Sequence, residues 1–155
     1  MPNNTVATTS RLEAVGTRYT AHVVAHEWRW VIIVGCALVL LMFIPLIWVA
    51  LRGTPGWQFM GTLHNYLDGA TYLSKMRQGE DASWAIQFLH TPEAHDGGYI
   101  MLLYPLMGNL AAALGLPLLV VFHAARVMAS LFMYAALYHL AATIWMNITT
   151  RRIFF

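Results

Sequence analysis

Charged residues are scarce in this sequence. Only 10% of its 155 residues are Asp, Glu, Lys or Arg, whereas 59% are hydrophobic; an average soluble domain carries about 25% charged residues. The net charge is +2, and the basic residues are scattered along the chain and do not form a stripe. This composition excludes a nucleic-acid-binding surface and is typical of a membrane protein.

Cysteine is almost absent as well. Cys36 is the single cysteine, so an internal disulfide is excluded, and no Cys/His spacing predicts a zinc site. His90, Glu93, His95 and Asp96 lie within seven residues of one another, and imidazole and carboxylate groups can hold a divalent metal. Because their spacing matches no strong metal motif, we interpret them as a solvated polar loop and predict no metal site.

Long uncharged runs are present in place of charge. Residues 31–51 give 21 consecutive residues without a charge, enough for a helix to cross a hydrocarbon core of about 30 Å. Trp28 and Trp48 lie near the two ends of this run, where interfacial aromatic residues are expected. Residues 118–147 carry one charge, Arg126. The sequence therefore predicts an all-α integral membrane protein with two transmembrane helices.

The two ends of the chain differ in character from these runs. Residues 1–30 form a polar segment rich in Thr, Asn and Ser, in which 20–30 have the partly amphipathic pattern of a helix leading along the headgroup layer. Residues 148–155 form a short basic C-terminal end.

Between the two predicted spans, residues 52–98 are polar and predict an extracytoplasmic loop. We expect Asp68 to act as the N-cap of an amphipathic helix at 69–78, with Gly79 as its stop. The apolar side of this helix carries Tyr72 and Met76, as in a helix lying on a surface.

The apolar segment 99–115 permits three interpretations. It has 17 residues, the lower limit for a span, and contains Pro105, Gly108 and Asn109. It is an interfacial helix, a re-entrant helix or a short transmembrane helix.

The distribution of basic residues predicts the orientation. Arginines flank the two predicted spans at the chain ends, whereas the middle loop holds more acidic than basic residues, so the positive-inside rule places both termini in the cytoplasm. We expect an integral protein of the bacterial inner membrane. The end arginines are Arg11, Arg18, Arg29, Arg151 and Arg152; the loop carries Arg52, Lys75 and Arg77 against Asp68, Glu80, Asp81, Glu93 and Asp96.

One series of residues in the loop and after it follows a known pattern. The series is Asp68-x3-Tyr72, Met76-Arg77-x-Gly79, Trp84, Pro105, Gly115 and Ala125-Arg126 before a closing apolar helix. Over roughly residues 31–152 it resembles the N-terminal part of polyprenol-phosphate-sugar-dependent glycosyltransferases of the GT-C fold. The resemblance implies that Asp68 is a catalytic base or a metal ligand. The chain departs from the family at Gly69, where a second acidic residue is common.

Three functions follow as hypotheses. Because the sequence ends at Phe155, whereas members of that family continue through many further spans, we first expect a small non-catalytic subunit on the periphery of a larger membrane complex, such as a photosynthetic or respiratory assembly. The second hypothesis is the N-terminal part of a GT-C glycosyltransferase that uses Asp68. In either case the partners are the lipid bilayer and other membrane subunits.

The third hypothesis is an antenna-like helix that binds a pigment. His139 lies in the middle of the predicted span 118–147, and Ala135 lies one turn earlier on the same face. This pair resembles the Ala-x3-His element of light-harvesting polypeptides and implies bacteriochlorophyll or haem ligation by His139; a hydrogen bond to another helix is the alternative. His123 and Arg126 share a face near the start of the span and are expected to contact lipid headgroups.

Overall fold

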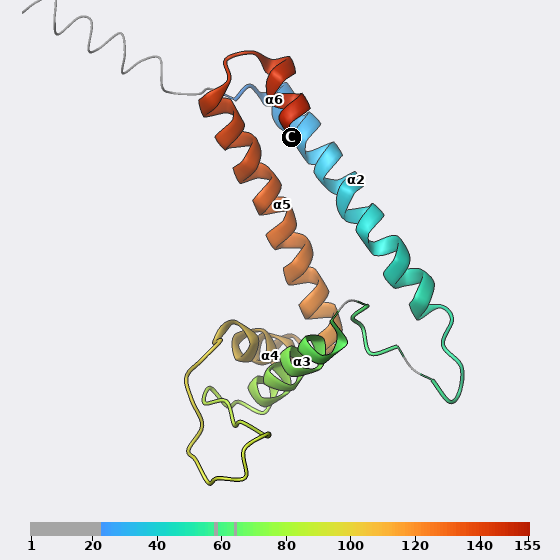
Figure 1. The fold of residues 1–155 in the computed structure, drawn as a ribbon, viewed down its shortest axis with the longest axis vertical. Coiled ribbons are helices and arrows are strands. Elements are labelled where there is room, and N and C mark those ends of the chain that lie inside the picture. The colour runs from blue at the N-terminus through green and yellow to red at the C-terminus, as the bar shows by residue number, and fades with distance from the viewer. Residues whose placement is uncertain (1–22, 58, 64) are drawn as a thin grey trace, which may run out of the picture. The chain divides into compact units, whose positions relative to one another are not determined.

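The computed structural model describes residues 23–57, 59–63 and 65–155, and every regular element in these ranges is a helix. The predicted amphipathic segment 20–30 lies partly outside these ranges, and the polar residues 1–19 lie wholly outside them. The elements are α2 (Ala25–Ala50), α3 (Tyr66–Glu80), α4 (Leu103–Leu114), α5 (Leu118–Ile144) and α6 (Ile148–Phe154) (Figure 1).

Two of these helices, α2 and α5, are long and apolar enough to cross a membrane. They have 26 and 27 residues, and only 17% and 11% of their most apolar windows are buried within the protein. A core helix of a soluble protein would be mostly buried, so the exposure of these apolar surfaces calls for an apolar surrounding.

The bounds of both helices differ from the prediction. α2 begins at Ala25, six residues before the uncharged run, because the charge of Glu27 is accommodated by hydrogen bonds inside the protein. α5 ends at Ile144. Asn147, predicted inside the span, is instead the N-cap of α6, and its side chain accepts a hydrogen bond from the Thr149 N–H at 2.8 Å. The predicted basic end is therefore a short helix.

The described chain divides into two compact units, and the division falls within α2 and within α5. The first unit comprises residues 23–39 and 129–155. In it the two long helices approach closely at Gly35, where an added Cβ would lie 3.3 Å from the Tyr134 ring. Small residues allow such an approach between apolar helices.

The second unit, residues 40–128, contains α3 and α4, which pack side by side (Figure 1). Its core consists of Met76, Met107, Ala111 and Val121. The two helices cross at Gly79 and Gly108: a Cβ on Gly79 would collide with the Pro105 backbone, and one on Gly108 with the carbonyl oxygen of Met76. Gly79 therefore lies inside α3 and serves as a contact residue, which corrects its predicted role as the helix stop.

The segment that follows α3 is irregular, and two contacts hold it. The carboxamide of Gln78 donates to the Gln87 carbonyl oxygen at 3.2 Å and accepts from the Gln87 N–H at 2.7 Å. Ile86 and Gly98 then pair through two backbone hydrogen bonds of 3.0 Å. The loop is thus attached to α3 at its beginning and closed at its base.

The predicted helix within 99–115 is shorter than the apolar segment. α4 has 12 residues and ends at Gly115, which adopts the left-handed conformation. At about 1.5 Å per residue it rises about 18 Å, well short of the hydrocarbon core. The regular helix is thus shorter than the 17-residue apolar segment from which it was predicted.

Candidate functional site

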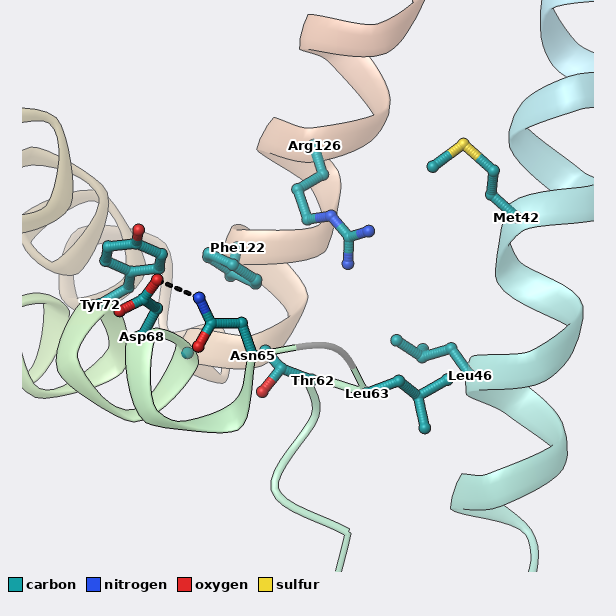
Figure 2. Close-up of a pocket in the computed structure, with 10 residues that line it drawn as sticks. Met42, Leu46, Thr62, Leu63, Asn65, Asp68, Tyr72, Phe122 and Arg126 are labelled. Carbon is teal, nitrogen blue, oxygen red and sulfur yellow. Dashed lines mark hydrogen bonds between the residues drawn. The ribbon is translucent and has the colours of Figure 1, made fainter.

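A cavity of about 320 Å³ lies at the start of α3 and within the second unit. Figure 2 shows its lining: polar side chains of α3 and the preceding segment, Arg126 extending from α5, and apolar side chains. The cavity is therefore amphiphilic. Its lining residues are Met42, Leu46, Thr62, Leu63, Asn65, Asp68, Gly69, Tyr72, Phe122 and Arg126.

Asp68 faces this cavity and does not cap the helix. α3 begins at Tyr66, and its N-cap is Asn65, which has the left-handed φ of 50° that Asn tolerates better than most residues. The predicted N-cap role of Asp68 is thus wrong: two residues with cap propensity lie three positions apart, and the earlier one starts the helix. Asp68 is left in the first turn, where a carboxylate is favoured by the helix dipole.

Asn65 also holds the Asp68 carboxylate. Its side-chain N–H donates a hydrogen bond to Oδ2 of Asp68, drawn as the dashed line in Figure 2. Among the described residues no hydrogen bond reaches Oδ1, and the Asp68 side chain is exposed. One carboxylate oxygen is therefore fixed, and the other is free to accept a proton from a bound molecule.

The backbone near Asp68 depends on two glycines. Gly69 packs against Thr62, and a Cβ there would collide with the Thr62 side chain. Gly61 has a φ of 100° and lies against Leu119, which any side chain at this position would displace. The Gly69 that departs from the acidic pair of GT-C enzymes thus has a packing role in this chain.

Arg126 supplies the positive charge of the cavity. Its Nη1 donates to Nδ1 of His123 at 3.3 Å, and its guanidinium lies 5.8 Å from the Phe43 ring centre and 6.0 Å from that of Phe122. The shared face predicted for His123 and Arg126 is thus a direct contact. Neither ion pair found in the described ranges involves Arg126, so its charge is available to an anion.

Tyr72, which lines the cavity, is stacked on Tyr104 of α4. The rings of Tyr72 and Tyr104 lie parallel, with centres 4.6 Å apart. Burial, together with the nearby Tyr72 and Asp68, raises the pKa of Tyr104 above its usual value. Tyr104 therefore remains an uncharged phenol around neutral pH, and the carboxyl group among the lining residues of the cavity is that of Asp68.

The arrangement combines a base, a cation and an apolar wall. Asp68 can accept a proton, Arg126 can neutralise a negative oxygen, and the side chains from α2 and Phe122 can contact an alkyl chain. Within the described ranges no three His, Cys, Asp or Glu side chains gather closely enough to hold a metal ion. A metal-ligand role for Asp68 would therefore lack companion ligands among these residues.

The other predicted site residues lie apart from the cavity. His139 is exposed on α5, and no hydrogen bond to it is found within the described part of the chain. In the loop, Nδ1 of His95 accepts from the Gly97 N–H at 3.0 Å, and its ring contacts Phe88. His95 thus stabilises the loop backbone.

The first unit contains a buried ionic network that was not predicted from the sequence. Glu27 is fully buried; Oε2 accepts from the Tyr138 hydroxyl at 2.6 Å and from Arg151 Nη1 at 3.1 Å, and Oε1 accepts from the Val24 N–H at 3.1 Å. Arg151 also donates from Nε to the Trp145 carbonyl oxygen at 2.6 Å. The only available signal was the carboxylate of Glu27, four residues before the first apolar run.

Comparison of the chain with protein-family models, with curated proteins and with solved structures finds no match.

Proposed function

We propose that this chain is an integral membrane protein of the GT-C glycosyltransferase type, that both of its ends lie in the cytoplasm, and that the Asp68 cavity is its reaction site on the opposite side. The observation that supports the proposal best is the position of Asp68. Its carboxylate is not used as a helix cap, and it lines a cavity together with an arginine that has no acidic partner in the described ranges.

The chemistry of such a site is group transfer from a lipid-linked sugar. An acceptor hydroxyl placed against Oδ1 of Asp68 loses its proton to the carboxylate while its oxygen bonds to the anomeric carbon. The bond from that carbon to the phosphate oxygen breaks, and the lipid phosphate leaves with the electron pair. Arg126 neutralises the negative charge that develops on the leaving phosphate.

The test is a transfer assay on the full chain in proteoliposomes. The donor is a polyprenyl-phosphate hexose with a radiolabelled sugar, and the acceptors are drawn from a membrane extract of the native host. Removing a general base costs about 10²- to 10⁴-fold in rate, so Asp68→Asn should reduce label transfer by at least about 100-fold.

Asp81→Asn is the matched control, because Asp81 lies at the other end of the same helix and outside the cavity lining. It should retain transfer. Equal transfer by the Asp68→Asn and unmodified proteins, or no transfer from any polyprenyl-phosphate sugar, would contradict the proposal.

A second candidate is the non-catalytic accessory subunit of a larger membrane complex. It is favoured by the wide apolar faces of the long helices, where Ile33, Met128 and Phe132 are each about two-thirds exposed or more. Such faces can contact either lipid or another subunit. Purification from native membranes in a mild detergent distinguishes the two: a stoichiometric partner that co-purifies favours the subunit, and a lone chain with transfer activity favours the enzyme.

A further inference from the structure

Arg152 on α6 is a cation without an anionic partner among the described residues. Its guanidinium lies 5.5 Å from the centre of the Trp30 ring on α2, and neither ion pair found in the described ranges includes it. Its Nε is buried and has no hydrogen-bond partner among these residues. Buried donors in proteins are nearly always paired, so we expect an acceptor for this guanidinium from outside the described chain.

Contacts on both sides of Arg152 in the sequence fix its position. Arg151 donates to the buried carboxylate of Glu27 at 3.1 Å. The ring of Phe155 contacts three aromatic rings of α2 and α5, with centres 5.5 to 5.8 Å apart. α6 is therefore held against the start of α2 (Figure 1), and the guanidinium of Arg152 belongs to a defined surface.

The surface around Arg152 is positively charged. Among the described residues of the first unit, Glu27 is the single acidic one, and its carboxylate is buried in the ionic network. His26 and Arg29 are exposed on α2. Their spacing places them on the same side of the helix as Trp30, on whose ring Arg152 lies. Arg29 and Arg152 thus form a cationic surface without a carboxylate beside it in the described part of this unit.

Large apolar side chains are exposed next to the cationic surface. On α6, Ile153 is 81% and Phe154 is 52% exposed, and Met146 in the turn before α6 is 85% exposed. A soluble anion would neutralise the arginines but leave these side chains in water. A phospholipid carries its phosphodiester and its acyl chains in one molecule, so it can neutralise the arginines and cover the apolar side chains together.

The cationic surface also lies at the depth of a phospholipid headgroup if the long helices span a bilayer. Arg29 lies one turn after the start of α2, and α6 begins four residues after the end of α5. Both α2 and α5 are long and apolar enough to cross a membrane. In such a chain, the start of α2 and the end of α5 reach the same bilayer surface, where lipid phosphates are found.

We infer that Arg29 and Arg152 bind the phosphodiester of an anionic phospholipid, such as phosphatidylglycerol, in the leaflet next to the two chain ends. Arginine suits this ligand because its guanidinium can form two parallel hydrogen bonds with phosphate oxygens. A zwitterionic lipid brings an ammonium group, which the cationic surface repels. The inference rests on the membrane location in the proposed function but not on sugar transfer, because the Asp68 cavity belongs to the second unit.

Native mass spectrometry of the full chain released from a mild detergent tests the inference, since each bound lipid appears as a separate mass. Phosphatidylglycerol and phosphatidylethanolamine with the same acyl chains are titrated separately. A basic residue near an anionic lipid surface contributes about 1 kcal/mol, a factor of about five in affinity. Arg152→Gln should therefore weaken the tightest binding of phosphatidylglycerol about fivefold, and Arg152→Gln combined with Arg29→Gln about 30-fold. The affinity for phosphatidylethanolamine should not change.

Two variants serve as controls. Arg152→Lys keeps the positive charge and should retain most of the preference for phosphatidylglycerol. Arg77→Gln removes an exposed arginine of the second unit that is already paired with Glu80 at 2.7 Å, and it should leave the preference unchanged. A loss in Arg152→Lys as large as that in Arg152→Gln would assign Arg152 to packing on Trp30, and would overturn the inference.

The remaining outcomes are also decisive. Equal affinity of Arg152→Gln and the unmodified protein for phosphatidylglycerol, or a preference that only Arg126→Gln removes, would overturn the inference and leave the proposed function standing. Displacement of the bound lipid by an equal concentration of inorganic phosphate would mean that the surface takes a free oxyanion, and would overturn the inference as well. A chain that stays in solution without detergent would contradict the membrane location, and with it both the inference and the proposed function.

Discussion

The hydroxyl of Tyr138 donates a hydrogen bond of 2.6 Å to the carboxylate of Glu27, although 111 residues separate the two in the chain. Arg151 completes the contact from α6 at 3.1 Å. A buried ion pair of this kind contributes little net stability relative to apolar residues, but removal of one partner leaves an uncompensated charge. The contact therefore fixes which parts of the chain meet in the first unit.

Arg151→Met should destabilise the first unit by about 3–5 kcal/mol, because the Glu27 carboxylate then stays buried without its cation. The midpoint of thermal unfolding in detergent measures the loss. Arg29→Met, which removes an exposed arginine from the same end of α2, should leave the midpoint nearly unchanged. The double variant Glu27→Gln with Arg151→Met should recover part of the loss, and a double variant as unstable as the sum of both single variants would argue against the pair.

Gly108→Ala should loosen the contact between α3 and α4. The new methyl group meets the Met76 carbonyl oxygen, and overpacking of this kind costs about 1–3 kcal/mol. Unfolding temperature and protease sensitivity of the segment between the helices report the change. Gly56→Ala is the matched control, since a Cβ there meets nothing within 4 Å; equal behaviour of both variants would contradict the close crossing.

Asn65→Ala should lower stability more than Asp68→Ala does, whereas Asp68→Ala should abolish any sugar transfer. Asn65→Ala forces an alanine into the left-handed conformation at the start of α3 and should cost about 1–2 kcal/mol. Asp68→Ala should change stability by no more than about 0.5 kcal/mol, the usual range for an exposed position, while abolishing any sugar transfer. A larger loss of stability for Asp68→Ala than for Asn65→Ala would restore Asp68 as the cap.

His139→Leu tests the hypothesis of pigment ligation. The imidazole is exposed on α5, so an axial ligand position is sterically open. If the chain purified from its native membrane absorbs as a haem or bacteriochlorophyll protein, the variant should lose or shift that absorption band. An identical spectrum in both proteins would remove His139 as the ligand. His123→Leu, at a half-buried histidine of the same helix, is the control for a general disturbance of α5.

The sequence predicted the parts of the fold that depend on local composition. The uncharged runs marked α2 and α5, and the alternation of polar and apolar residues marked α3 with Gly69 and Met76 on its buried side. The residues at which the helices begin were harder to predict from the sequence. Asn65 and Asp68 are both good N-cap residues three positions apart, and residue preference alone does not choose between them.

The site itself could be predicted only in part. Asp68 was singled out as a helix cap and through the family resemblance, and Arg126 as the one charge of an apolar run. Their presence in one cavity depends on how the segment before α3 folds. The Glu27 network could not be predicted from the sequence, for a different reason. Its partners come from the beginning and the end of the chain, and pairings over such separations leave no local periodicity to detect.

The two contacts that hold the loop after α3 have a consequence for engineering. The Gln78 side chain forms two hydrogen bonds with the Gln87 backbone, and the Ile86–Gly98 pair closes the base of the loop. The two ends of the loop are therefore held together by contacts that do not involve its tip near Pro92. Insertion of an epitope or a fluorescent protein at this tip would lengthen the loop and leave the helices in place. The tip is accordingly the natural place to attach a reporter to this chain.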